Sequence, residues 1–255
     1  MNVKSFSIMT FNIRFGLAKD SDNLWEDRKE SVIKIIKEKN PDFIGIQEVN
    51  DFQLKFLKKN LKDYKVTGIY NKNNPRWQQL PVFYKKTWEC ILSEHFFLSD
   101  TPYKESKFTE SQWPRQTVTT LFRQNQSIVS ITNAHFDFKD KVQVKSADLI
   151  RHKLSCLNSK IPKILCGDFN ADPTGKCYHQ FIFKNPPEFK DPFSTIQSAT
   201  FHGFTGVPNT GRIDWILYSG NLSPISKEII KYNENGKYPS DHFPVYVKFN
   251  LNPKD

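Results

Sequence analysis

The residues Ile164-Leu165-Cys166-Gly167-Asp168-Phe169-Asn170-Ala171-Asp172-Pro173 decide how the rest of the chain is interpreted. The mostly apolar run 161–166 predicts a buried strand, which Pro173 prevents from continuing. Asp168 and Asn170 stand two positions apart, and such positions point to the same side of an extended chain. The segment therefore predicts a carboxylate and a carboxamide side by side at the end of a core strand. Taken alone, the two residues fit an Asx-rich turn before a helix equally well.

The same arrangement, a polar side chain directly after an apolar run, recurs along the chain. Residues 6–11 predict a first strand that is followed by Asn12, and residues 43–46 predict a second strand that is followed by Gln47 and Glu48. Apolar residues at helical spacing predict helices at 25–39, 52–61 and 144–157, with a short helix or turn at 177–183. Further strands are predicted at 64–70, 82–84, 88–98, 117–122, 127–133, 211–218, 226–232 and 245–249. The strands 117–122 and 127–133 are predicted to form a hairpin. Since no repeat or linker composition interrupts this order, we expect residues 1–255 to form one α/β domain with mixed sheets and helices outside.

Composition limits the classes of protein that remain. Hydrophobic residues make up 38% of the chain and include 22 Phe, enough for a sizeable core. The four cysteines are spread out without a C-x-x-C pair, which favours buried reduced thiols and a cytosolic compartment. No apolar window is long enough to cross a membrane, and the stretch 6–13 is too interrupted by polar residues for a signal peptide. We therefore expect a cytoplasmic protein without stable membrane association.

The formal net charge of +10 favours partners that carry phosphate, such as nucleic acid, a nucleotide or an anionic lipid surface. The lysines are dispersed, so a solvated basic face explains the charge equally well. A phosphate-binding glycine loop is excluded, because Gly175-Lys176 is followed by Cys177 and lacks the required upstream glycine.

Polar residues at the predicted strand ends form a set that can build one site, because strand ends converge in α/β architecture. The set comprises Asn12, Glu48, His135, Asp168, Asn170, Asp214, Asp241 and His242. Carboxylate and amide oxygens suit a hard divalent cation, and Mg²⁺ or Mn²⁺ fits this set better than zinc. Two histidines have an aspartate available, His242 with Asp214 and His135 with Asp137, which suggests proton transfer or oxyanion stabilisation.

Each of these residues also has a structural explanation. Asp241 and His242 can belong to a helix cap or a turn, and Asp214 can form a salt bridge with Arg212. His135 can be a hydrogen-bonded core histidine. The joint pattern is more specific than any single residue.

Six segments resemble, in the same order, the endonuclease/exonuclease/phosphatase superfamily, whose members include deoxyribonucleases, abasic-site nucleases, deadenylases, inositol-polyphosphate 5-phosphatases and bacterial sphingomyelinases. They are Met9-Thr10-Phe11-Asn12, Ile46-Gln47-Glu48-Val49, Asn133-Ala134-His135-Phe136-Asp137, Gly167-Asp168-Phe169-Asn170, Arg212-Ile213-Asp214-Trp215 and Ser240-Asp241-His242-Phe243-Pro244-Val245. The segments 97–102 and 113–115 are similar to those of a bacterial branch of this superfamily.

The resemblance implies a four-layer α/β sandwich of the DNase I-like type, with two stacked mixed sheets flanked by helices. It further implies hydrolysis of a phosphate ester assisted by Mg²⁺. It also implies the following roles. Glu48 and Asn12 bind the metal, with Asp241 near it; Asp168 activates water; Asn170 binds a phosphoryl oxygen; His242, polarised by Asp214, stabilises phosphoryl charge; His135 assists the phosphate or the leaving group; and Arg115 faces the phosphate.

The chain departs from some branches of the superfamily. No tyrosine matches the one that abasic-site nucleases carry in the site, and Cys166 and Ala171 differ from the flanks found in 5-phosphatases. A sphingomyelinase would need secretion and membrane-inserting aromatic loops. A binding module with a dead site is disfavoured, because every motif residue is present.

We therefore predict a monomeric, metal-dependent phosphodiesterase or nuclease that acts on nucleic acid or a nucleotide. Arg76-Trp77 and Trp113-Pro114-Arg115 pair a basic group with an aromatic ring and can stack on a base beside a phosphate, although a core tryptophan with a surface arginine explains each pair as well. The alternatives are a phosphatase acting on a small phosphorylated metabolite or inositol phosphate, and a sphingomyelinase-like lipid phosphodiesterase.

Overall fold

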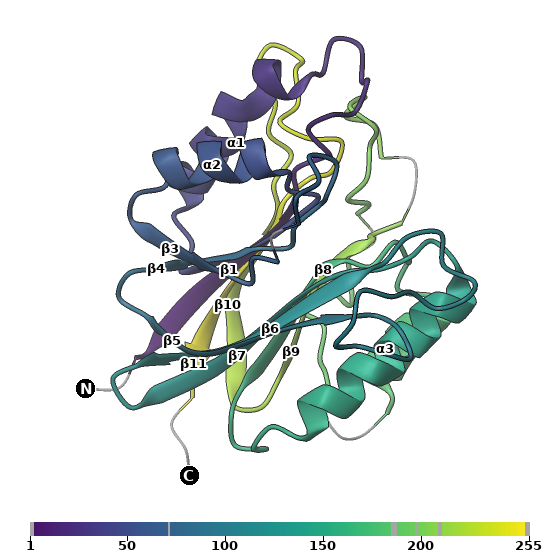
Figure 1. The fold of residues 1–255 in the computed structure, drawn as a ribbon. Helices are drawn as coiled ribbons and strands as arrows, with labels where there is room; N and C mark the ends of the chain where they lie inside the picture. Colours follow the sequence, from purple (N-terminus) through teal and green to yellow (C-terminus); the bar gives the residue numbers. More distant parts are fainter. Residues whose placement is uncertain (1–2, 71, 185–187, 197, 209–210, 253–255) are drawn as a thin grey trace.

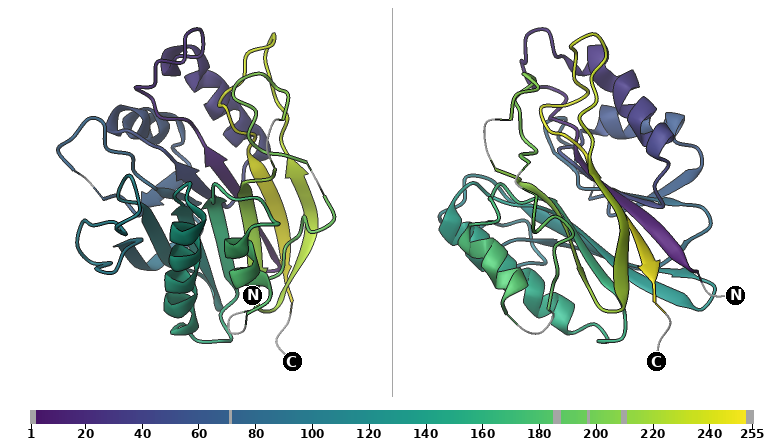
Figure 2. Two further views of the ribbon diagram at one scale, coloured as in Figure 1. Left: turned by 90° about the vertical axis from the view of Figure 1, so that its right-hand side faces the viewer. Right: turned by 180° about the vertical axis from the view of Figure 1, so that it is seen from behind.

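Two β-sheets lie face to face in the computed structural model, which describes residues 3–70, 72–184, 188–196, 198–208 and 211–252. Helices α1 (Trp25–Lys39) and α2 (Asp51–Asn60) cover the outer face of the first sheet. Helices α3 (Asp140–Ser155) and α4 (Lys176–Ile182) cover the outer face of the second. The four layers are visible from three directions (Figures 1 and 2). The predicted four-layer α/β sandwich is confirmed, whereas a single domain over residues 1–255 stays a prediction.

Both sheets contain parallel and antiparallel pairs. The first has six strands in the order β10 (Leu222–Ile229), β11 (Val245–Leu251), β1 (Ser5–Asn12), β2 (Phe43–Gln47), β4 (Val82–Lys85) and β3 (Tyr64–Thr67). The second has five strands in the order β5 (Glu89–Phe97), β6 (Gln116–Gln124), β7 (Ser127–His135), β8 (Lys163–Asp168) and β9 (Asp214–Ser219). The pairs β1–β2 and β7–β8 are parallel and the other strand pairs are antiparallel, so the predicted β6–β7 hairpin is confirmed.

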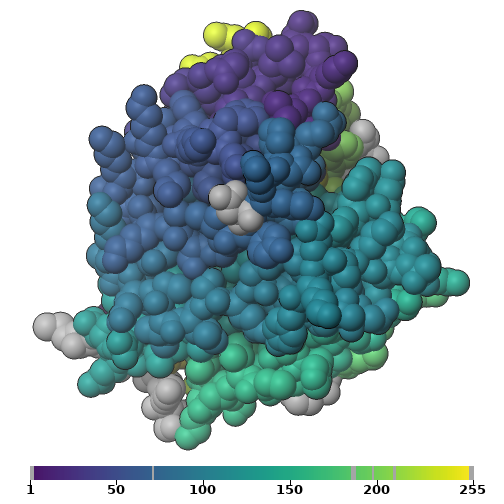
Figure 3. Space-filling model, viewed as in Figure 1, coloured from purple at the N-terminus to yellow at the C-terminus, as the bar shows by residue number. Residues whose placement is uncertain are grey.

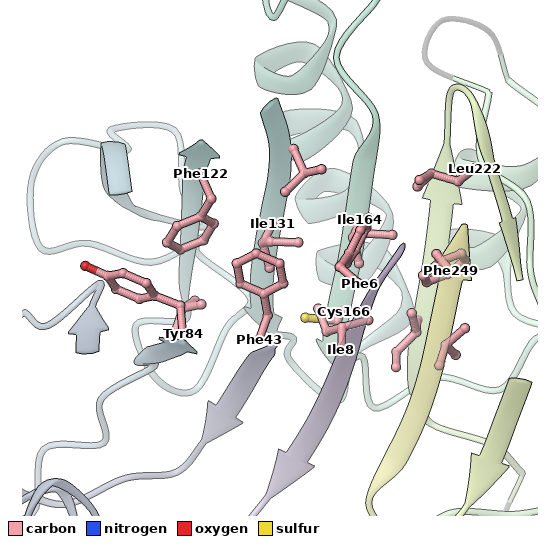
Figure 4. Packing of buried hydrophobic residues seen from close by; sticks show 14 of the residues in the cluster. Phe6, Ile8, Phe43, Tyr84, Phe122, Ile131, Ile164, Cys166, Leu222 and Phe249 are labelled. Carbon is pink, nitrogen blue, oxygen red and sulfur yellow. The ribbon is translucent and has the colours of Figure 1, made fainter. Parts of the chain in front are cut away.

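The main hydrophobic core fills the space between the two sheets (Figure 4). Phe43 of β2 meets Phe122 of β6 with their ring centroids 4.8 Å apart, and Phe6 packs edge-on against Phe43. Removing such a side chain from water stabilises a fold by about 1.5–3 kcal/mol. Because aromatic contacts lock the two sheets together, the strand ends that carry the polar residues lie on a rigid scaffold.

The helices begin and end close to the predicted residues, and α1 matches the prediction exactly in its bounds. It is capped by Asn40, whose φ of 46° lies in the left-handed region that asparagine tolerates after a helix end. Helix α3 begins at Asp140, earlier than the predicted Val144, because a carboxylate in the first turn stabilises a helix although it adds nothing to the apolar pattern. None of the described helices is long and apolar enough to cross a membrane.

The largest deviations from prediction occur at exposed elements. Strand β10 occupies 222–229 instead of 226–232, and as an exposed edge strand with a register shift after Pro224 it lacks a clear apolar alternation. All four thiols are free, but the expectation that they are buried is wrong for Cys156, which is exposed at the C-terminal cap of α3. Cys90 is only partly buried.

Candidate active site

The strand register brings three of the predicted site residues into one row across the second sheet. His135 of β7 pairs with Asp168 of β8, and Asp168 pairs with Asp214 of β9. Gly167 makes this close pairing possible, because a Cβ atom there would lie 1.9 Å from the carbonyl oxygen of Ala134. The row is therefore a property of the scaffold and does not depend on a loop.

The ends of β1 and β2 in the first sheet meet this row. The amide nitrogen of Asn12 donates hydrogen bonds to Asp168 Oδ2 (2.9 Å) and Glu48 Oε1 (3.3 Å). The amide oxygen accepts a hydrogen bond from the backbone N–H of Arg14 (2.9 Å). Asn12 thus joins carboxylates of the two sheets, and it faces them with its N–H group and not with the oxygen that a metal ligand would offer.

Glu48 has an unusual backbone conformation at the point where β2 ends. Its φ of 64° lies in the left-handed region, which costs free energy for a residue with a Cβ atom and persists where the surroundings enforce it. Its Oε2 accepts a hydrogen bond from the backbone N–H of Phe15 (2.7 Å), and its Oε1 lies 3.9 Å from His135 Nε2. The carboxylate is therefore held in one orientation at the junction of the two sheets.

His242 and Asp214 form the predicted pair. His242 Nδ1 donates to Asp214 Oδ2 (2.9 Å), and His242 Nε2 lies 3.8 Å from Asp168 Oδ2. Burial alone would lower the pKa of His242, but the carboxylates of Asp214 and Asp168 outweigh it and raise this pKa to about 10. The imidazole is therefore a protonated cation near neutral pH. The alternative salt bridge between Asp214 and Arg212 is wrong, since Arg212 forms a buried ion pair with Asp191.

Asp168 is completely buried, and burial raises the pKa of its carboxyl group to about 7. This value already includes the lowering effect of His242 and the smaller raising effect of the Asp214 charge. Asp168 Oδ1 accepts a hydrogen bond from the backbone N–H of Asn170 (2.9 Å). The side chain of Asn170 donates to the carbonyl oxygen of Phe136 (3.0 Å), so Asn170 lies beside Asp168 as predicted and is anchored to the end of β7.

Arg115 and His135 lie in contact. Arg115 Nη1 donates to His135 Nε2 (3.0 Å). Burial, and secondarily the charges of Arg115 and His242, hold the pKa of His135 well below its usual value, so its imidazole is neutral. The predicted partner Asp137 is wrong: β7 ends at His135, so the two-residue alternation of a strand no longer applies, and Asp137 accepts a hydrogen bond from Ser111 instead.

Asp241 lies at the edge of this group. Its Oδ1 accepts a hydrogen bond from Ser240 (3.1 Å), and its Oδ2 lies 3.5 Å from Arg14 Nη1. Arg14 also donates two hydrogen bonds to Asp20. Sequence reasoning missed Arg14, although it stands two positions after Asn12, the same spacing that links Asp168 to Asn170.

The residues of this group fit a divalent cation. Asp168, Asp214 and His242 place ligand atoms within 4.8 Å of one another, but His242 is protonated and its Nδ1 is bonded to Asp214, so a metal would compete with a bound proton. Glu48 forms no ion pair with a lysine or arginine in the part of the chain that the structure describes. Its carboxylate, which the amide group of Asn12 links to that of Asp168, is the most available oxygen donor for a hard cation.

A cavity of about 570 Å³ opens beside the group. Glu48, His135 and Arg115 line it, and its walls come from residues 72–80 and 105–116. These two segments adjoin in the space-filling view, where they are coloured blue to teal, and the ion pair between Lys72 and Glu105 joins them (Figure 3). Both predicted pairs of a basic and an aromatic residue therefore face one pocket. The first wall segment contributes Arg76 and Trp77, and the second contributes Trp113 and Arg115.

Comparison with known proteins agrees with this arrangement. The Endonuclease/Exonuclease/phosphatase family matches residues 9–242. Nocturnin from Xenopus laevis is 24% identical over 98% of this chain and 73% of its own length. The CCR4-Not complex 3'-5'-exoribonuclease subunit Ccr4 from Phaeosphaeria nodorum is 22% identical over 92% of this chain, which spans 56% of that protein.

Two solved bacterial structures match almost the whole chain. An endonuclease/exonuclease/phosphatase family protein from Bacteroides thetaiotaomicron is 25% identical with a TM-score of 0.90, and the match covers 98% of both chains. The mannosyl-6-phosphatase from the same species is 25% identical with a TM-score of 0.87, covering 96% of this chain and 99% of that one. The chain therefore belongs to the Endonuclease/Exonuclease/phosphatase family.

Proposed function

We propose that the protein is a metal-dependent phosphoesterase. Membership of the family supports phosphate-ester hydrolysis as the type of chemistry. The observation that carries the proposal is the facing pair of Asp168, whose pKa is raised to about 7, and the protonated His242, 3.8 Å away. A carboxylate that can take a proton near neutral pH and a fixed cation are the two groups that water attack on a phosphate requires.

Asp168 acts as the general base in this proposal. It takes a proton from the attacking water. A base with a pKa near the working pH is largely in its unprotonated form and still binds the proton strongly enough to drive the transfer. The hydrogen bonds from Asn12 and from the backbone of Asn170 stabilise its ionised form and fix its direction. Asn170 also provides a group that binds a phosphoryl oxygen.

Three further side chains stabilise the charge that develops on the phosphoryl oxygens. His242 is kept protonated by Asp214, and Arg115 supplies a buried guanidinium group. His135, neutral and held by Arg115, assists the phosphate or the leaving group through a hydrogen bond. Positioning and charge neutralisation of this kind provide most of the catalysis in phosphoryl transfer.

The metal in this proposal is Mg²⁺ or Mn²⁺. Glu48 is its main ligand, with Asp241 nearby, while Asn12 becomes a ligand only if it presents its oxygen instead of the N–H group. When bound, the metal neutralises charge on the phosphate and orients it. A carboxylate such as that of Glu48, which has no lysine or arginine partner among the described residues, favours a hard cation.

The first substrate class that we propose is a phosphodiester of nucleic acid or a nucleotide. Arg76 and Arg115 are cations of the pocket, and Trp77 and Trp113 are aromatic side chains that line it. Such a combination suits a base next to a phosphate. The net charge of +10 adds a general attraction for polyanions.

The second substrate class is a small phosphorylated metabolite. Two observations favour it: the cavity has the volume of a small molecule, and the match to a mannosyl-6-phosphatase covers nearly the whole of both chains. Hydrolysis of inositol phosphates or of lipid phosphodiesters remains a prediction, and the same assay tests it. The monomeric state and the cytoplasmic location also remain predictions.

The test is a hydrolysis screen with Mg²⁺ and Mn²⁺ over single-stranded DNA, duplex DNA, RNA, bis-p-nitrophenyl phosphate, sugar phosphates, inositol phosphates and sphingomyelin. Wild type should hydrolyse at least one class, and Asp168→Asn should hydrolyse it about 10²-fold or more slowly. Asp148→Asn makes the same chemical change on the exposed face of α3, where Asp148 pairs with Lys184, and should retain activity. Equal rates for Asp168→Asn and wild type would contradict the proposal.

A further inference from the structure

Two aromatic side chains beside Arg115 leave much of their surface exposed. Trp113 is 50% exposed and Phe138 is 62% exposed, and both line the cavity. Large apolar surfaces that remain exposed inside a pocket are typical of ligand contacts. Phe138 did not stand out in the sequence, because the strand pattern ends at His135.

Both rings lie next to Arg115, a cation that contacts His135 of the strand-end residues. The guanidinium carbon of Arg115 lies 6.0 Å from the ring centre of Trp113 and 5.1 Å from that of Phe138. The same guanidinium donates to His135. A phosphate bound by Arg115 would therefore lie next to both rings.

The other aromatic rings of the cavity already have partners. The indole N–H of Trp77 donates to the carbonyl oxygen of Tyr70 (3.0 Å), and its ring packs against Tyr70 and Phe97. Phe15 lies under the guanidinium of Arg76, 5.7 Å away. Trp113 and Phe138 are the lining rings with the most exposed surface left for a ligand.

We propose that Trp113 and Phe138 form a clamp that binds a ring of the substrate next to the phosphate held by Arg115. This inference rests on the proposed function and narrows its substrates to phosphate esters that carry a ring with an apolar face. A nucleobase and a hexose both offer such a face, whereas a short acyclic ester does not. Stacking on the two rings adds affinity that does not depend on the charge of the phosphate.

The test measures binding by titration calorimetry in the presence of a chelator, so that metal-assisted turnover does not consume the ligand. The ligands are inorganic phosphate, glycerol 3-phosphate, adenosine 5'-monophosphate and mannose 6-phosphate. The proteins are wild type, Trp113→Ala and Phe138→Ala. Tyr103→Ala is the matched control, because Tyr103 is 73% exposed on the same irregular segment but does not line the cavity.

Wild type should bind at least one ring-bearing ester about 10-fold more tightly than glycerol 3-phosphate. Trp113→Ala and Phe138→Ala should remove most of this difference, leave the affinity for inorganic phosphate unchanged and keep the wild-type melting temperature. If adenosine 5'-monophosphate shows this tighter binding, the ring is a nucleobase. If mannose 6-phosphate shows it, the ring is a hexose.

The clamp is refuted if the ring adds no affinity, if Tyr103→Ala weakens binding as much, or if the two variants weaken inorganic phosphate equally. The last result would mean that the rings only support Arg115. Failure of the proposed function would appear separately, as the absence of metal-dependent hydrolysis by wild type in the screen.

Discussion

The strand-end cluster (Asn12, Glu48, His135, Asp168, Asp214 and His242) differs in construction from the two pocket walls, residues 72–80 and 105–116. The cluster is largely buried: the strand register fixes Asn12, His135, Asp168 and Asp214, while hydrogen bonds hold Glu48 and His242 beside them. The walls are mostly irregular and contain many exposed residues. From this difference we infer that the rigid strand ends carry the chemistry, whereas the irregular segments, which can vary independently, select the ester.

Removal of divalent metal should have the largest effect, and it should act on the cluster alone. Chelation is expected to abolish hydrolysis of every ester, because the cation that would neutralise charge on the phosphate during water attack is then missing. Rates measured after addition of EDTA, and again after Mg²⁺ or Mn²⁺ is restored, check this outcome. Full activity in excess chelator would contradict a metal mechanism.

His242→Ala should lower kcat by roughly 10²-fold, because it removes the cation that Asp214 keeps protonated beside the phosphate. All esters should be affected by a similar factor, since the residue belongs to the chemistry and not to the walls. His179→Ala, on the exposed surface of α4, is the control and should behave like wild type. Unequal losses among esters would show that His242 also contributes to substrate choice.

Gly167→Ala should destabilise the fold without a direct role in chemistry. The new Cβ atom would overlap the carbonyl oxygen of Ala134, and φ at this position is 146°, so we expect a loss of roughly 2–5 kcal/mol in the free energy of unfolding. Denaturant unfolding measures it. Gly236→Ala is the control, because its φ is 80° but nothing lies within 4 Å, so only the strain is added. Equal losses for the two variants would mean that the close strand pairing is not the cause.

Arg76→Ala should have the smallest effect, and it should act on the walls. Arg76 is exposed, lines the pocket and forms no salt bridge with a carboxylate among the described residues. We expect kcat/KM to fall roughly 2–5-fold at low salt, with a weaker dependence on ionic strength and an unchanged kcat. Arg123→Ala, which removes an exposed arginine paired with Glu89, is the control. A fall in kcat itself would place Arg76 in the chemistry.

The sequence predicts the cluster because the change from apolar to polar residues marks the end of each buried strand. Apolar runs predict where β1, β2, β7 and β8 end. Because strand ends converge in α/β architecture, the sequence alone groups Asn12, Glu48 and Asp168 into one site. The same alternation of strands and helices predicts an α/β domain with mixed sheets, whereas the four-layer sandwich is implied only by the resemblance to the superfamily.

The remaining features depend on details that periodicity does not carry. The orientation of the Asn12 amide is decided by one backbone N–H of Arg14. The false pairing of His135 with Asp137 came from extending the strand alternation past its end. Phe138 enters the pocket from the connection after β7, and no repeating pattern fixes the path of such a connection.

In this account the cluster performs the reaction and the walls select the ester. The most direct measurement compares kcat/KM for a ring-bearing ester and an acyclic ester in wild type, Asp168→Asn and Trp113→Ala, with Mg²⁺ present. Asp168→Asn should lower both values by about 10²-fold or more and leave their ratio unchanged, whereas Trp113→Ala should reduce the ratio with little effect on the acyclic ester. Near-normal kcat in Asp168→Asn, or an unchanged ratio in Trp113→Ala, would contradict this division.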